Sequence, residues 1–157
     1  MGAKRTALTT GAALCAAVVT GCGGHAATKP DVVAQANAIC ASALRDERAT
    51  PPPATGQASL PALSGYLQQV LPIVGREVSN LHGLPRPAED RALLDRYLDA
   101  VTDLGSTYRS LAAAARRGDQ DGVDQALAAL QANPASSLAV RYGLIQCAGA
   151  AGTAVSR

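Results

Sequence analysis

The feature that most restricts the fold is the spacing of apolar residues between positions 91 and 117. They recur every three or four positions, at Leu94, Tyr97, Leu98, Val101, Leu104, Tyr108, Leu111 and Ala115. Residues at this spacing share one face of an α-helix, whereas a half-buried strand alternates apolar and polar positions. The segment therefore predicts a long amphipathic helix, and Gly118 is suited to end it.

Three other segments carry the same spacing. Asp31, Ser59 and Asp119 are the expected N-caps of a first, a second and a fourth helix. The apolar positions are Val32, Val33, Ala36, Ile39, Cys40, Ala43 and Leu44 in the first helix, Leu60, Leu63, Leu67, Val70, Leu71, Val74, Val78 and Leu81 in the second, and Val123, Ala126, Leu127, Leu130, Leu138, Tyr142 and Ile145 in the fourth. No segment shows the alternation of a strand, so we predict an all-α fold.

The connections predict how these helices are arranged. Those at 82–87 and 117–119 are short, which favours antiparallel neighbours, and we expect an up-down-up-down antiparallel four-helix bundle. The helices should be kinked near Pro72 and Pro134, because proline removes a helical hydrogen bond and its ring clashes with the preceding turn. A fresh helix start at Pro72 and a short break at Pro134 are the alternatives. The proline-rich segment 49–58 is expected to be an extended linker.

The charge balance excludes one class of partner. The chain has 14 basic and 12 acidic residues, and two of the basic ones, Lys4 and Arg5, lie in a segment that we expect to be removed. Nucleic-acid binders carry a basic stripe, and proteins held on anionic lipid by charge carry a polybasic cluster. Neither is visible, so nucleic acid is not an expected partner.

The N-terminus is typical of a signal peptide. Lys4 and Arg5 precede the apolar, alanine-rich stretch Ala7–Val19, which is shorter than the roughly 20 residues of a membrane-spanning helix. The following residues, Val19, Thr20, Gly21 and Cys22, resemble the lipobox of bacterial lipoproteins. This resemblance implies recognition of Val19, Thr20 and Gly21 by the lipoprotein signal peptidase, cleavage before Cys22, a diacylglyceryl group on its sulfur and often a palmitate or similar acyl group on its new amino group.

The same resemblance implies a domain organisation and a location. Residues 1–21 would be the signal peptide, 22–30 the lipidated cysteine and a flexible tether, 31–147 the helical domain, and 148–157 a tail whose small residues favour fraying. The domain would be exported and held to the lipid bilayer through acylated Cys22, at the outer face of the cytoplasmic membrane. Two or more acyl chains suffice for stable anchoring. Ordinary secretion is the alternative.

The cysteines predict one crosslink. Cys15 leaves with the signal peptide, and if Cys22 is lipidated, only Cys40 and Cys147 remain to pair in an oxidising compartment. We expect a disulfide between them, and two unpaired buried thiols are the alternative. The segments Ala38–Cys40 and Tyr142–Cys147 also resemble small helical lipoproteins of actinobacteria, a resemblance that implies no known activity.

No pattern in the sequence indicates catalysis, a metal or a cofactor. His25 lies in the tether and His82 at the end of the second helix, so the two histidines cannot form a compact metal site. Ser64 and Ser79 lie near His82 in sequence, but no Gly-x-Ser-x-Gly turn accompanies them. We therefore predict no catalytic residue, no metal and no cofactor.

Two further groups favour structural interpretations. Asp95, Asp99 and Asp103 share one face of the third helix, and a solvated face with salt bridges is favoured over a cation site. The tyrosines lie on or beside apolar stripes and favour core packing over a ligand-stacking set; they are Tyr66, Tyr97, Tyr108 and Tyr142.

Two functions remain after these exclusions. The first is a membrane-anchored, non-catalytic lipoprotein that acts as an interaction or structural module on an unknown protein of the cell envelope. The second is a carrier or binder of an apolar small molecule or lipid, held between helices loosened at Pro72 and Pro134. A large apolar cavity would favour the carrier, and a densely filled core would count against it. An enzyme would need a cleft with convergent polar groups, which the sequence does not indicate.

Overall fold

The computed structural model describes residues 26–53 and 59–153, and all regular structure in these residues is helical. The helices are α1 (Lys29–Arg48), α2 (Leu60–His82), α3 (Arg91–Arg117), α4 (Gln120–Ala132), α5 (Ala135–Tyr142) and α6 (Ile145–Thr153). The predicted all-α fold is confirmed. None of these described helices combines the length and the apolarity that crossing a membrane requires.

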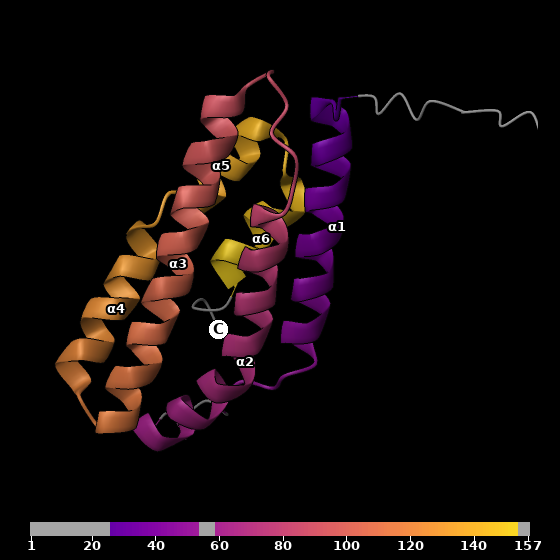
Figure 1. Cartoon of the computed structure of the whole chain (residues 1–157). Coiled ribbons are helices and arrows are strands. Elements are labelled where there is room, and N and C mark those ends of the chain that lie inside the picture. Colours follow the sequence, from indigo (N-terminus) through magenta and orange to yellow (C-terminus); the bar gives the residue numbers. More distant parts are fainter. Residues whose placement is uncertain (1–25, 54–58, 154–157) are drawn as a thin grey trace, which may run out of the picture.

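The long helix α3 lies at the centre of the arrangement and packs against α2, α4 and α5. The helices α1, α2 and α3 lie side by side, α4 flanks α3 on its other side, and α5 and α6 lie behind them (Figure 1). The helix α6 packs against α1, so the last helix of the chain meets the first. Helix α6 also extends through Thr153, which makes the first part of the expected C-terminal tail helical.

Two of the three N-cap residues predicted from the sequence are confirmed, and the third is wrong. Ser59 and Asp119 cap α2 and α4 as predicted, each accepting a hydrogen bond from a backbone N–H of the first turn. The predicted Asp31 cap of α1 is wrong, because Thr28 is the cap. Thr28 Oγ1 accepts from the Asp31 N–H at 3.4 Å, and the Asp31 carboxylate accepts from the Thr28 N–H at 3.0 Å. This reciprocal capping box satisfies two backbone donors and starts the helix earlier.

The chain behaves differently at the two prolines that the sequence places inside helices. Helix α2 continues through Pro72, and Figure 1 shows a bend in its first half. At Pro134 the helix breaks, which is one of the two predicted outcomes: α4 ends at Ala132, Asn133 is extended, and α5 begins at Ala135. Asn133 Nδ2 donates to the Ala100 carbonyl, and its Oδ1 accepts from the Ala135 N–H, each at 2.9 Å. Gly143, with φ +101°, ends α5, so α4, α5 and α6 occupy the length predicted for one helix.

The core consists of two adjoining clusters of buried side chains. One gathers residues of α1, α3, α5 and α6 around Cys40 and Cys147, and the other gathers residues of α2, α3 and α4. Val78 packs against both clusters. Because the chain has no Phe or Trp, the largest core side chains are the tyrosines Tyr97, Tyr108 and Tyr142.

Candidate functional site

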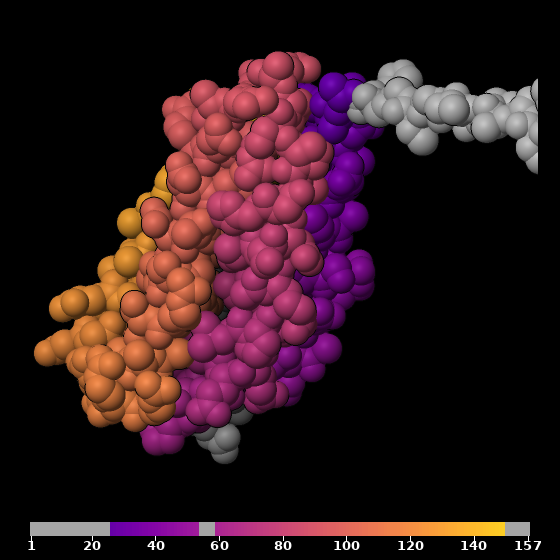
Figure 2. Space-filling model, viewed as in Figure 1, coloured from indigo at the N-terminus to yellow at the C-terminus, as the bar shows by residue number. Residues whose placement is uncertain are grey.

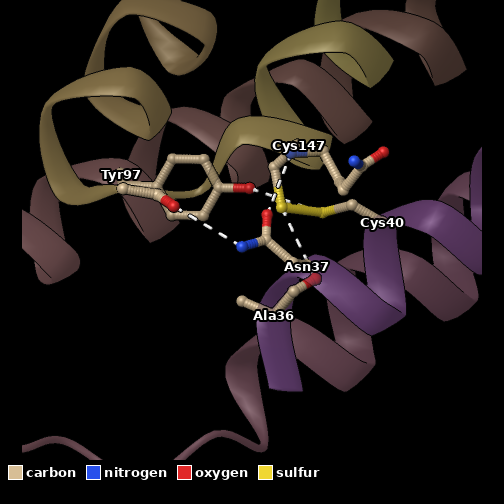
Figure 3. The surroundings of a disulfide bond; sticks show 7 residues. Ala36, Asn37, Cys40, Tyr97 and Cys147 are labelled. Atoms are coloured by element: carbon tan, nitrogen blue, oxygen red, sulfur yellow. Dashed lines mark hydrogen bonds between the residues drawn. A yellow bond between two sulfur atoms is a disulfide. The ribbon is translucent and has the colours of Figure 1, made fainter. Parts of the chain in front are cut away.

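Cys40 of α1 and Cys147 of α6 form a disulfide inside the core, which confirms the predicted pairing. The S–S distance is 2.04 Å, the two Cα atoms are 5.0 Å apart, and 107 positions separate the cysteines in sequence. Both side chains are buried. The bond therefore fastens the end of the domain to its beginning (Figure 3).

Polar contacts around the disulfide hold α6 on α1. Asn37 Oδ1 accepts a hydrogen bond from the Gln146 N–H at 2.9 Å, and Asn37 Nδ2 donates to the Gly143 carbonyl at 3.4 Å (Figure 3). An α1 side chain thus serves the unpaired backbone groups where α5 ends and α6 begins. The Tyr97 hydroxyl lies 4.0 Å from Cys40 Sγ and is the donor, because a disulfide sulfur carries no proton.

Two carboxylates face a single small cavity in the interior. Glu47 of α1 and Glu77 of α2 are half-buried, and both line a space of about 20 Å³ together with Tyr97 and Tyr108 of α3. A space of this size holds about one water molecule. Among the residues that the structure describes, no Lys, Arg or His side chain lines the cavity, so the two carboxylates have no counter-charge from them.

This arrangement favours the protonated forms of these groups. Burial and the negative charge of Glu47 raise the pKa of Glu77 to about 7. Burial also raises the pKa of Glu47. The pKa values of Tyr97 and Tyr108 rise well above the ordinary range, because of burial first and the nearby carboxylates second. Glu77 is therefore close to half-protonated at neutral pH, whereas both tyrosines keep their protons.

This acidic cluster, Glu47, Glu77, Tyr97 and Tyr108, is the group that the sequence interpretation missed. A signal was present, because Glu77 is spaced helically between the apolar residues Val74 and Leu81. A carboxylate on the apolar face of a helix points toward the core, where its pKa is perturbed. The two tyrosines were correctly assigned to the core, but not to the same cavity as the carboxylates.

The other candidate site residues from the sequence analysis do not lie in this cluster. His82 is exposed and bonds to Thr102 Oγ1 at 2.8 Å, while His25 lies outside the described residues. Asp95, Asp99 and Asp103 are exposed, and Asp95 pairs with Arg86 at 3.3 Å, in agreement with a solvated face. Within the part of the chain that the structure describes, no three His, Cys, Asp or Glu residues are placed to hold a metal ion.

The remaining tyrosines also lie at or near the core. Tyr142 is buried and Tyr66 is half-buried, as the core interpretation predicted. The lipobox residues Val19, Thr20, Gly21 and Cys22 lie outside the described residues.

The chain matches no protein-family model, no curated protein and no solved structure.

Proposed function

We propose that this chain is a non-catalytic lipoprotein at the outer face of the cytoplasmic membrane, acting by contact as an interaction or structural module of the cell envelope. The lipobox at residues 19–22 supports the anchor and the location. The single structural observation that carries the proposal is the Cys40–Cys147 disulfide in the core. Its partners would be the bilayer, through acylated Cys22, and an envelope protein.

The disulfide supports an exported protein for a chemical reason. Structural disulfides persist in oxidising compartments and are rare in the cytosol, where thiols are kept reduced. Because the Cys40–Cys147 bond is buried and joins distant parts of the chain, it has the character of a structural crosslink. It therefore accords with export by the signal peptide of residues 1–21.

The filled interior favours a protein that acts through surface contacts over a carrier that encloses a ligand between its helices. Small-molecule pockets usually measure about 300–1,000 Å³. The cavity beside Glu47 and Glu77 measures only about 20 Å³, and the hollows of about 430 and 360 Å³ are open on the surface and enclose no space between the helices. A carrier that encloses its ligand would need the helices to separate.

The bundle topology belongs to the same proposal. We take α4, α5 and α6 together as the fourth member of an up-down-up-down bundle, broken at Pro134 and Gly143. Because α1 has 20 residues, its length of about 30 Å separates its N-terminal end, which continues the tether, from the opposite end of the domain. The opposite end would face away from the membrane and be free to meet a partner.

The anchor is tested by cell fractionation with metabolic palmitate labelling of the wild type and Cys22→Ala. We expect labelled wild-type protein in the membrane fraction, released only by detergent, and unlabelled variant outside it. Cys15→Ala is the matched control, because the signal peptide carrying it is removed, and should behave as wild type. Equal membrane retention of Cys22→Ala would contradict the anchor.

The contact role is tested by crosslinking in native membranes, followed by purification, proteomics and lipid analysis. We expect an envelope protein that is enriched with the anchored wild type and not with Cys22→Ala. A stoichiometric bound lipid without any protein partner would instead favour the carrier.

A further inference from the structure

Two surface hollows meet along the seam between α2 and α3. One, of about 430 Å³, lies where α2 begins and α3 ends; the other, of about 360 Å³, lies further along the same seam. Gln68 lines both hollows, so they adjoin on the same seam, and we call the two together the seam groove. Figure 2 shows α2 and α3 side by side on the viewed face of the molecule.

The second hollow has an apolar lining and the length of an acyl chain. Its walls include Leu71, Pro72 and Val78, and Gly75 leaves it open because a Cβ there would meet no atom within 4 Å. From Gln68 to Val78 the helix rises about 15 Å. This is half of the roughly 30 Å hydrocarbon thickness of a bilayer, which is the depth that one lipid chain spans.

The first hollow is basic and contains a polar group without a partner. Arg116 and Arg117 line it, Arg109 lines the second hollow, and no Asp or Glu lines either one. Arg117 pairs with Asp119 at 3.2 Å, whereas Arg116 has no ion pair within the described residues. Ser64 is only 8% exposed, and its hydroxyl has no hydrogen-bond partner within the same described part of the chain.

The lining of the groove favours a hydrocarbon chain over an extended peptide. An extended peptide carries backbone N–H and C=O groups that need partners when they are buried. Most backbone groups of α2 and α3 are used within the helices, except that the Gln68 carbonyl lacks its helical donor because Pro72 has no N–H. Among the described residues, the second hollow offers only Gln68 and Arg109 as polar side chains. These few groups cannot pair with the repeated N–H and C=O groups of a buried peptide. A hydrocarbon chain has no such requirement and gains from burial against Leu71 and Val78.

We propose that the seam groove binds a single-chain amphiphile with an anionic head. The hydrocarbon chain lies in the apolar hollow between Gln68 and Val78, and the carboxylate or phosphate head lies beside Arg116, Arg117 and Ser64. Guanidinium groups suit both heads because their planar N–H donors match two oxygens at once. This inference does not depend on the anchor proposed at Cys22.

The direct test is calorimetric titration of the full chain carrying Cys22→Ala, so that no attached acyl chain competes. Dodecanoate and dodecyl phosphate, kept below their micellar concentrations, distinguish a carboxylate head from a phosphate head. We expect one molecule of at least one of them to bind saturably, and dodecanol and inorganic phosphate to bind at least about tenfold more weakly.

Variants separate the two halves of the groove. Arg116→Gln with Arg117→Gln should weaken binding of the anionic amphiphile by about tenfold or more, and Arg141→Gln on α5 should leave it unchanged. Gly75→Leu should remove binding by filling the apolar hollow, since a side chain at Gly75 meets no atom within 4 Å of its Cβ position. Ser79→Leu, exposed on the same helix but outside the groove, is the matched control.

Thermal unfolding of each variant keeps the test valid. Gly75→Leu should unfold no earlier than the parent protein, because leucine favours a helix more than glycine does. The proposal is overturned if neither amphiphile binds saturably, if dodecanol binds as tightly as the anions, or if folded Gly75→Leu binds as the parent does.

Discussion

Glu77 occupies a position on α2 that helical spacing assigns to an apolar side chain, between Val74 and Leu81. Its carboxylate shares a cavity with Glu47 and meets no positive side chain there. Removing a charge from water without a partner is costly, and a carboxyl group in that position gains a proton instead. The protein therefore contains a group that titrates near neutral pH in its folded state.

Glu77 should make the folded protein more stable in mild acid than at neutral pH. Its pKa of about 7 in the folded protein lies above its ordinary value of 4.5, so the folded state binds the proton more tightly than the unfolded chain. The free energy of unfolding should then fall as pH rises from about 4.5 to about 7, by at most about 3 kcal/mol, and be level above that range. Urea denaturation between pH 4.5 and pH 8 measures this profile.

Glu77→Gln should flatten most of that decline, because glutamine does not titrate. Glu89→Gln is the matched control, since Glu89 is exposed and lies outside the cavity, and it should leave the profile as in the wild type. A wild type whose unfolding free energy rises between pH 5 and pH 7 would contradict the assignment of Glu77.

At the scale of single helices, most boundaries follow from local backbone chemistry. Gly118 ends α3 with φ +71°, in the left-handed region that side chains with a Cβ rarely adopt, and its N–H bonds back to the last turn. Asp119 then caps α4 directly. By contrast, Gly65 lies within α2, where a Cβ would meet no atom within 4 Å.

These two glycines should respond to alanine with opposite signs. Gly118→Ala should lower the free energy of unfolding by about 1–2 kcal/mol, because its left-handed conformation strains an L-residue. Gly65→Ala should raise it by about 0.5–1 kcal/mol, because alanine loses less conformational entropy within a helix. Equilibrium denaturation of both variants provides the comparison, and a shift of the same sign in both would contradict the assigned backbone roles.

At the scale of the whole molecule, the Cys40–Cys147 bond closes most of the described domain into one loop. A crosslink stabilises mainly by restricting the unfolded chain, and the effect grows with loop length. The cysteines are 107 positions apart, and the core is small and lacks Phe and Trp. The crosslink should therefore supply a large share of the stability of this domain.

Removing the bond should lower the free energy of unfolding by about 4–5 kcal/mol. Cys40→Ala with Cys147→Ala tests this directly by urea denaturation. Dithiothreitol should destabilise the wild type by a similar amount and leave the double variant unchanged, which separates loss of the crosslink from loss of packing. If complete reduction of the disulfide left the urea denaturation midpoint of the wild type unchanged, the stabilising role of the bond would be contradicted.

The sequence by itself determined the helical class, the stripe of α3, the caps at Ser59 and Asp119 and the pairing of Cys40 with Cys147. The helices and the stripe follow from the periodicity of apolar residues, and the caps follow from backbone donors that need partners nearby. The cysteine pairing follows from thiol chemistry, because only two cysteines were left to pair. Tertiary structure decided the rest. The sequence allowed a kink or a short break at Pro134, and in the folded chain Asn133 is extended before the proline and bonds to the Ala100 carbonyl of α3.

The acidic cluster and the seam groove also depend on tertiary structure. Glu47 and Glu77 lie on different helices, and the packing of α1, α2 and α3 brings them to one cavity. Arg116 and Ser64 likewise meet in one hollow only because α2 and α3 pack side by side. Periodicity specifies which face of a helix is buried, but the partner that covers it depends on how all the helices fill space together.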